Sequence, residues 1–299
     1  MKIVGSQYLD PAVLARLPNL EFAARRLVDG AFVGYHKSPK FGYSVEFVDH
    51  RDYARGDDPR SIDWKVWARK DKYYVKRYEM ESQLKATVLL DVSRSMDFGE
   101  GKLTKLAYGS YLAASLCYLV IHQNDMAGLV TFDDKIRHFI PARGSRSHLR
   151  AVLGALGSVK PGPKTDVGRS CHHLAETINA RGMVIVISDL LDEPEAVLSG
   201  LRHFQHKKHD VIVFHLLDDA ELDFGYDELA NFRDLEGGAR VAVDPATFRA
   251  QYRERIGAFC SDIKEGCRKS AIDYVAVRTS TPIEKTLGDY IRFRARRSV

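Results

Sequence analysis

Short apolar runs alternate with amphipathic helical patterns along residues 81–299, and this alternation constrains the fold more than any other feature of the sequence. The runs occupy residues 86–90, 126–132, 183–187, 211–217 and 272–277. Those at 86–90 and 183–187 show no polar alternation, which is typical of strands covered on both faces. Segments between the runs carry apolar residues at helical spacing. Buried strands that alternate with helices predict an α/β fold with a doubly wound, mostly parallel sheet.

The composition excludes several classes of protein. The chain has 299 residues, of which 45% are hydrophobic and 28% charged, so it is not a wholly disordered protein. Its formal net charge of +5 is too small to indicate a nucleic-acid-binding protein. No apolar run approaches the roughly 20 residues of a membrane span, and the start lacks the apolar stretch of a signal peptide. We therefore expect a cytoplasmic protein that has no membrane partner.

The sequence pattern changes near residue 80. Residues 30–79 are rich in Tyr, Phe, Gly and charge, and the runs at 43–48 and 72–78 predict strands. Residues 10–26 predict a short helix with Pro11 in its first turn. We therefore expect an N-terminal helix and β-rich extension at 1–80, followed by an α/β domain at 81–299 with an insertion at 219–243.

Oxygen-bearing side chains follow two of the predicted buried strands. Asp91, Ser93 and Ser95 come directly after the first strand, and Asp189 follows the run at 183–187. Between them, a loop that contains Thr165 leads into the start of a helix. Ligands of open parallel sheets bind beyond the carboxyl ends of the strands. All five side chains offer hard oxygen and none offers nitrogen or sulfur, so the sequence predicts a site for Mg²⁺ or Mn²⁺.

These residues also have a plainer interpretation. Ser93 and Ser95 can cap a helix that begins near residue 102, and Asp91 and Asp189 can be ordinary polar residues at strand ends. A D-x-S-x-S string is a weak signal by itself. Its position directly after a buried strand, with Thr165 and Asp189 at matching places, favours the metal site.

The same five residues resemble the metal-ion-dependent adhesion site of von Willebrand factor A domains, and every standard position of that site is filled. In that family the serines and the threonine ligate Mg²⁺, and the two aspartates act directly or through water. A carboxylate from the partner completes the octahedron. The resemblance implies a sheet of von Willebrand factor A type and a metal-dependent protein-interaction site.

A second resemblance covers nearly the whole chain. It is carried by residues 34–39, Glu46-Phe47, residues 51–53, residues 56–65 and Ala68-Arg69, most specifically by 56–65. These segments are similar to the signature of the von Willebrand factor A-like family labelled domain of unknown function fifty-eight, whose genes lie beside those of MoxR-type AAA+ ATPases. Many members carry membrane helices that this chain lacks, so it resembles the short soluble branch. The resemblance implies an adaptor in the assembly or maturation of protein complexes, with a MoxR-type ATPase or its client as the partner.

Four residues of the signature are candidates for partner binding. Gly56, Asp57, Asp58 and Asp63 can form an acidic docking patch, or instead a turn whose carboxylates cap a short helix through Ile62. The sequence favours the turn without excluding the patch.

Three other interpretations are open. A metal-assisted hydrolase would use the same ion with Asp97 or Asp166 as its general base, but no catalytic motif follows a strand and we expect no enzyme. The basic, aromatic residues 60–78 suit a single-stranded nucleic acid. Strand alternation would turn those aromatic side chains inward, however, so nucleic acid is not an expected partner. His203, His206 and His209 have metal-like spacing, but a solvated helix end explains them better.

Overall fold

The structure is a computed structural model, and it describes residues 24–25, 27–28, 47–54, 62, 64–70, 72–78, 83–99, 103–162, 166–226, 230–233, 240–243 and 245–297. The chain forms two compact units. The larger comprises Met1–Pro39 and Lys85–Val299, and the smaller comprises Lys40–Leu84.

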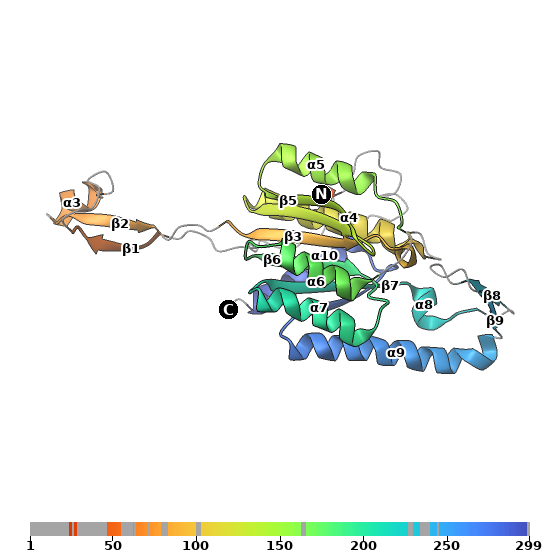
Figure 1. Ribbon diagram of the computed structural model, residues 1–299. Coiled ribbons are helices and arrows are strands. Elements are labelled where there is room, and N and C mark those ends of the chain that lie inside the picture. The colour runs from red at the N-terminus through yellow and green to blue at the C-terminus, as the bar shows by residue number, and fades with distance from the viewer. Residues whose placement is uncertain are drawn as a thin grey trace, which may run out of the picture. The chain divides into compact units, whose positions relative to one another are not determined.

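A six-stranded sheet forms the centre of the larger unit (Figure 1). Its strand order is β10-β7-β6-β3-β4-β5. Neighbouring strands pair in parallel, except that β5 runs antiparallel to β4. The predicted α/β fold with a doubly wound, mostly parallel sheet is therefore confirmed. The strands are β3 (Lys85–Asp91), β4 (Met126–Phe132), β5 (Ile136–Arg143), β6 (Met183–Ser188), β7 (Asp210–Leu217) and β10 (Asp273–Arg278).

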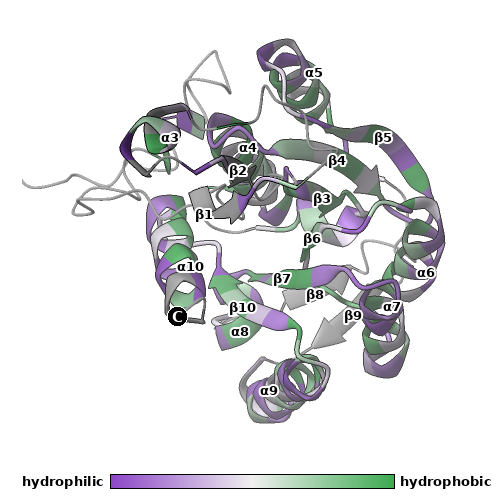
Figure 2. Cartoon of the chain, turned by 90° about the vertical axis from the view of Figure 1, so that its left-hand side faces the viewer, coloured by the Kyte–Doolittle hydropathy of each residue, from purple (hydrophilic) through white to green (hydrophobic). Residues whose placement is uncertain are grey.

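Helices cover both faces of this sheet (Figure 2). One face carries α4 (Lys105–His122), α5 (Arg146–Gly157) and α10 (Ile283–Arg297). The other carries α6 (Val167–Thr177), α7 (Pro194–His206) and α9 (Pro245–Lys269). Because both faces are covered, every residue of β6 and all of β3 except Lys85 are buried.

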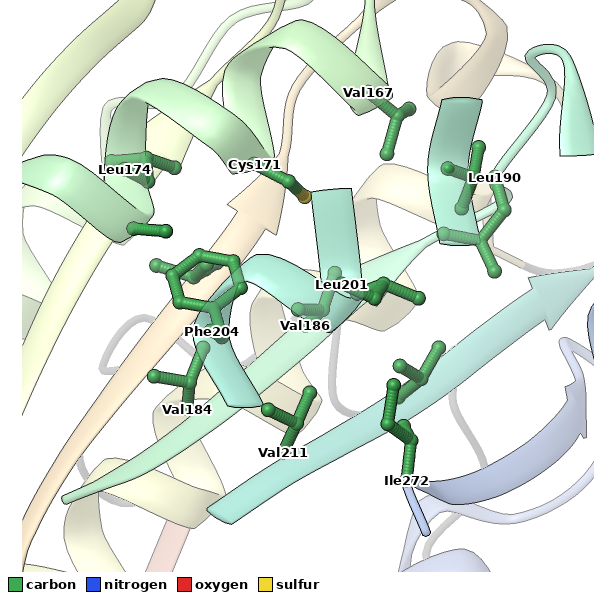
Figure 3. Close-up of a cluster of buried hydrophobic side chains, with 14 of the residues drawn as sticks. Val167, Cys171, Leu174, Val184, Val186, Leu190, Leu201, Phe204, Val211 and Ile272 are labelled. Atoms are coloured by element: carbon green, nitrogen blue, oxygen red, sulfur yellow. The ribbon is translucent and has the colours of Figure 1, made fainter. Parts of the chain in front are cut away.

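A continuous apolar core lies between the sheet and the second group of helices (Figure 3). The helical stripe expected at Val167, Cys171, Leu174 and Ile178 packs into it. Phe204 of α7 enters the same core and is fully buried. Burial of such side chains contributes about 1.5–3 kcal/mol each, which fixes β6 and its carboxyl end relative to α6 and α7.

The chain changes direction across the sheet between β3 and β6. From β3 it continues outward to β4 and β5, and from β6 it continues outward to β7 and β10. In open sheets of this order the ligand crevice lies beyond the carboxyl ends of the two strands where the order reverses. The ends of β3 and β6 are Asp91 and Ser188. The topology therefore places the expected metal site at the position where such sheets bind ligands.

Three short elements lie between β7 and α9, within the expected insertion at 219–243. They are α8 (Asp219–Asp223), β8 (Ala230–Arg233) and β9 (Arg240–Val243), and the two strands pair antiparallel. Helix α8 begins with a capping box in which Asp218 and Glu221 each accept a backbone N–H of the other.

The smaller unit contains a two-stranded antiparallel pair and a helix. These are β1 (Phe47–Asp52), β2 (Tyr74–Tyr78) and α3 (Trp64–Lys70). The expectation that strand alternation turns the aromatic residues inward is wrong for Trp64 and Trp67, since both lie on α3 and are 56% and 37% exposed. Tyr73, just before β2, is 50% exposed.

Among the described helices, none combines the length and the apolarity of a membrane span. All four cysteines are free thiols.

Candidate metal centre

Asp91 ends β3 as a fully buried carboxylate. Its Oδ1 accepts the backbone N–H of Ser93 at 2.9 Å, and its Oδ2 accepts the hydroxyl of Ser188 at 2.6 Å. Ser93 belongs to the loop after β3 and Ser188 ends β6, so the carboxylate is held from both sides of the point where the strand order reverses.

Within the described residues, no Lys or Arg side chain forms an ion pair with the Asp91 carboxylate. Burial, and then the nearby Asp189 carboxylate, raise the pKa of Asp91 to about 7, while hydrogen bonds from Ser188 and Ser93 act in the opposite direction. A buried carboxylate with a raised pKa and a second acidic group beside it is the electrostatic setting in which a divalent cation is stabilised.

Ser93 and Ser95 present their hydroxyls to each other. Their Oγ atoms lie 3.0 Å apart, and the two residues flank Arg94 at the start of the 3-10 helix η2 (Arg94–Asp97). The capping interpretation of these serines is wrong. Thr104 caps α4 through its side chain, and Ser93 makes no side-chain capping hydrogen bond to η2.

The spacing of these hydroxyls fits a small, hard cation. Two neighbouring ligands of an octahedral Mg²⁺ ion, each bound at ~2.1 Å, are about 3.0 Å apart. The Ser93 and Ser95 hydroxyls are hydrogen-bonded to each other at 3.0 Å, so an ion bound to both oxygens would keep them at about their present separation. Two hydroxyls and a buried carboxylate form a hard oxygen donor set, and such a set suits Mg²⁺ or Mn²⁺ rather than zinc.

Asp189 follows β6 and is also fully buried. Its backbone carbonyl accepts a 2.8 Å hydrogen bond from Nε2 of His215 on β7, and Nδ1 of that ring lies 2.7 Å from the Tyr274 hydroxyl. A carbonyl can only accept, so His215 carries its proton on Nε2 and its Nδ1 accepts from Tyr274.

The residue after Asp189 has a strained backbone. Leu190 turns the chain in a left-handed conformation, with φ 53°. Such strained turns occur at functional sites that the surrounding structure holds in place.

A buried lysine, which the sequence analysis missed, pairs with Asp189. Lys105 Nζ lies 2.8 Å from Asp189 Oδ2, and both side chains are completely shielded from solvent. The same ammonium pairs with Glu221 of α8. Burial by itself lowers the pKa of Lys105, but Asp189 and Glu221 outweigh it and hold that pKa above its usual value. Lys105 is therefore an ammonium at the edge of the candidate site.

The loop that leads to Thr165 approaches the same edge. Gly162 N–H donates to the carbonyl of Val92, the residue after Asp91, at 2.6 Å. A side chain at position 162 would collide with Asp133, because a Cβ there would lie 1.9 Å from Asp133 Oδ2. Thr165 itself lies outside the described residues.

The remaining candidate residues are placed as follows. Gly56, Asp57, Asp58 and Asp63, the candidates for partner binding, lie outside the described residues. Asp166 accepts the Arg169 N–H at 2.9 Å as the N-cap of α6, and Asp97 is an exposed residue of η2.

Histidine clusters do not add a metal site to the described part of the chain. No group of three or more His, Cys, Asp or Glu side chains suited to hold a metal is found there. His203 pairs with His172 and Glu176 on the surface. The solvated helix end expected for His209 is wrong, since that residue is buried against the Ile178 carbonyl.

Comparison with known proteins identifies the family. The model of a family described as "Protein of unknown function DUF58" matches residues 49–259, which is more than half of the chain. The chain belongs to the DUF58 family. Uncharacterized proteins of Mycobacterium tuberculosis (Rv1480) and Mycobacterium bovis (Mb1516) are each 26% identical to it over 293 residues, which are 96% of this chain and 90% of each relative.

Solved structures resemble this DUF58 chain at low sequence identity. BatB from Bacteroides thetaiotaomicron is 16% identical with a TM-score of 0.48, and the match covers 71% of this chain and 99% of BatB. An aerotolerance-related membrane protein from Bacteroides fragilis is also 16% identical, with a TM-score of 0.47 and coverage of 72% and 99%. The SpRpn10 VWA domain is 12% identical, with a TM-score of 0.38 and coverage of 69% and 94%.

Proposed function

We propose that this DUF58 protein is a metal-dependent protein-interaction module rather than an enzyme. In this proposal Asp91, Ser93, Ser95, Thr165 and Asp189 hold Mg²⁺ or Mn²⁺, and a carboxylate of a partner takes a remaining coordination position. The observation that carries it is the pair of hydrogen-bonded serine hydroxyls, 3.0 Å apart, that follow the buried Asp91 carboxylate at the point where the strand order reverses; Ser93 makes no side-chain capping hydrogen bond.

The ion would supply a positive charge that attracts a carboxylate. Asp91 and Asp189 bring negative charge to the site, whereas the hydroxyls are neutral, so an ion held there keeps affinity for another anionic oxygen. Ser188 and the Ser93 N–H fix the orientation of Asp91, and His215 fixes the backbone of Asp189. The residues of this chain therefore hold the donors in place before any partner arrives.

A cavity reaches Val92, the residue that follows Asp91, and in this proposal it receives the side chain of the partner. It measures about 300 Å³ and is lined by Val92 and by the loop at 158–162. Arg137 and Lys160 also line it. Lys160 at its wall favours the approach of an acidic side chain, whereas Arg137 is paired with Asp133.

The partner that the family resemblance supports is a MoxR-type AAA+ ATPase or its client, in the assembly or maturation of protein complexes. The hydrolase alternative has less support. Asp166 is engaged as a helix cap and Asp97 is exposed on η2, so neither is poised as a general base beside Asp91.

Metal titration and partner capture test this function. Wild-type protein is titrated with Mg²⁺ in a calorimeter, and binding to the purified MoxR-type ATPase of the same organism is measured with Mg²⁺ or with EDTA. Asp91→Ala is expected to lose both activities without unfolding. Asp262→Asn, an exposed acidic position on α9, is the matched control and is expected to keep both. Mg²⁺ binding by Asp91→Ala at the wild-type affinity would disprove the metal site, and capture at full strength in EDTA would disprove metal dependence.

One observation favours a second activity, the binding of single-stranded nucleic acid by the smaller unit. Trp64, Trp67 and Tyr73 are exposed, and the rings of Trp67 and Tyr73 stack with an interplanar angle of 15°. Arg69 and Lys72 are exposed close by in the sequence. Exposed aromatic rings with basic neighbours suit base stacking. Fluorescence anisotropy with a labelled oligothymidylate should show binding that weakens steeply with salt and is lost in Trp64→Ala; no binding at low salt would exclude this activity.

A further inference from the structure

Lys105 is placed where a lysine is energetically unfavourable unless it has a specific task. It is the first residue of α4, and the positive end of a helix dipole disfavours a cation there. Its side chain is also completely buried, and removal of an ammonium from water is costly. Thr104 already caps this helix, so Lys105 is not needed to begin it.

Two carboxylates offset these costs, and they come from different parts of the chain. Asp189 follows β6 and holds the ammonium at 2.8 Å. Glu221 lies on α8, at the start of the insertion, and holds the same ammonium with Oε1. Its Oε2 accepts the Asp218 N–H at 3.0 Å, so the capping box of α8 fixes the position of Glu221. Lys105 Nζ also lies over the Phe98 ring, 5.7 Å from the ring centroid, where the aromatic face attracts the positive charge.

The acidic cluster explains why a cation is needed here. Asp189 and Glu221 share the Lys105 ammonium, and Asp91 ends β3, the strand that pairs with β6 next to Asp189. One ammonium cannot neutralise three carboxylates once Asp91 is ionised as well. The described charges of the cluster therefore leave room for a divalent cation beside Asp91, whereas Lys105 occupies Oδ2 of Asp189.

We propose that Lys105 is a built-in counter-cation that shares Asp189 with the bound metal and sets the metal affinity of the site, and that Glu221 draws the ammonium partly away from Asp189. This inference rests on the proposed metal site. Lys105 stabilises the acidic cluster when no metal is bound. When a metal is bound, the two positive charges repel each other, so Lys105 keeps the affinity moderate and binding reversible.

The two partners of the ion pair give opposite predictions. In Lys105→Met the repelling charge is gone and Asp189 is free to serve the ion, so Mg²⁺ should bind roughly tenfold more tightly or better. In Glu221→Gln the ammonium is held by Asp189 alone, and Mg²⁺ should bind several-fold more weakly than to wild type. A purely structural role of Lys105 would weaken binding in both variants.

The experiment is a Mg²⁺ titration by calorimetry of wild type, Lys105→Met, Glu221→Gln and the double variant, with thermal unfolding in the presence and absence of Mg²⁺. Lys105→Met should be less stable than wild type without metal and should gain more in Tm from Mg²⁺. The double variant serves as the test if Lys105→Met does not fold without metal, because it removes one charge of each sign. It should bind Mg²⁺ more tightly than Glu221→Gln does.

The outcomes separate the two proposals. If wild type and every variant fail to bind Mg²⁺, the proposed metal site is wrong. If wild type binds Mg²⁺ but Lys105→Met binds it equally or less tightly and the double variant gains nothing over Glu221→Gln, the role of Lys105 as a counter-cation is overturned and the metal site stands. Asp262→Asn is again the control and should bind Mg²⁺ like wild type.

Discussion

The Ser188 hydroxyl donates a 2.6 Å hydrogen bond to Asp91 Oδ2, although the two residues are 97 positions apart in the sequence. They end the two strands between which the order of the sheet reverses. The other carboxylate oxygen of Asp91 accepts the Ser93 N–H. Because both oxygens have donors from the protein, the direction of the Asp91 carboxylate is fixed by the fold, and Ser188 is the group that connects β6 to it.

Replacement of Ser188 by Ala tests this connection. The Asp91 oxygen would lose a donor in a site without solvent, so we expect a loss of about 1–3 kcal/mol of stability in urea unfolding. The pKa of Asp91 should rise further because a hydrogen bond that lowers it is removed. Mg²⁺ should also bind more weakly, since the carboxylate is less fixed. Ser158→Ala, at an exposed hydroxyl beside α5, should change stability by no more than about 0.5 kcal/mol. Equal stability of Ser188→Ala and Ser158→Ala would contradict the role given to Ser188.

The raised pKa of Asp91 predicts a pH dependence. In the metal-free protein this pKa is about 7, against an ordinary value of 3.8, so the folded state holds the proton more tightly than the unfolded state. The contribution of Asp91 to stability is therefore present below about pH 4 and is lost as pH rises through about 7. Mg²⁺ must displace that proton, so its affinity should rise with pH up to about 7 and then level off.

Calorimetric titrations between about pH 5.5 and 8.5 measure this effect, with urea unfolding of the metal-free protein at the same pH values. Asp91→Asn has no proton to lose at this position and should lack the corresponding fall in stability. A Mg²⁺ affinity that does not change across this range would show that Asp91 is already ionised without metal.

The fold was predictable because its signals are local. Strands β3 and β6 are buried on both faces, so nearly every residue in them is apolar and the runs are visible in the sequence alone. The positions of Asp91 and Asp189 follow from the same signals, since Asp91 comes directly after the run at 86–90 and Asp189 comes after Ser188 at the end of the run at 183–187. The strand order then brings these two ends together.

The partners of these aspartates were not predictable. Lys105 occurs at the start of an amphipathic helix, where a lysine is normally solvated, and its partner Glu221 is 116 residues away. Nothing in the local sequence shows that α8 brings a carboxylate to that helix. The exposed aromatic residues of α3 were missed for a different reason: Trp64 and Trp67 lie between strand-like runs, and the helical period of so short a segment is weak.

Gly162 should be intolerant of any side chain. A Cβ at this position would lie 1.9 Å from Asp133 Oδ2, and Asp133 is a buried carboxylate held by Arg137. Burial opposes the ionisation of Asp133, but the Arg137 hydrogen bond outweighs it and lowers its pKa, so the carboxylate stays charged and does not simply move aside. In Gly162→Ala the loop must shift and lose the bond to the Val92 carbonyl, with an expected cost of about 1–3 kcal/mol.

Gly154 provides the control for this substitution. It lies within α5 and a Cβ there meets no atom within 4 Å, so Gly154→Ala should stabilise the protein by up to about 1 kcal/mol through helix propensity. Urea unfolding of both variants gives the comparison, and Mg²⁺ titration shows whether the loop also affects the metal site. A Gly162→Ala protein as stable as wild type would mean that the loop is not fixed against Asp133.

His215 is expected to act as a neutral donor that secures Asp189. Burial lowers the pKa of His215 to about 4, against an ordinary value of 6.5, so this residue contributes stability above about pH 6.5 that is lost as pH falls toward 4. This slope is opposite in sign to that of Asp91. His215→Leu leaves the Asp189 carbonyl and the Tyr274 hydroxyl without their partner and should cost about 1–3 kcal/mol at neutral pH.

A glutamine at position 215 separates the hydrogen bond from the titration. The amide nitrogen of His215→Gln can still donate toward the Asp189 carbonyl, so this variant should be more stable than His215→Leu at neutral pH. It carries no titrating ring, so the loss of stability between about pH 6.5 and 4 should be smaller than in wild type. NMR titration of the His215 ring provides an independent measurement. A ring that titrates near its ordinary pKa in the folded protein would show that water reaches it, and Asp189 would then lack the fixed donor that the site requires.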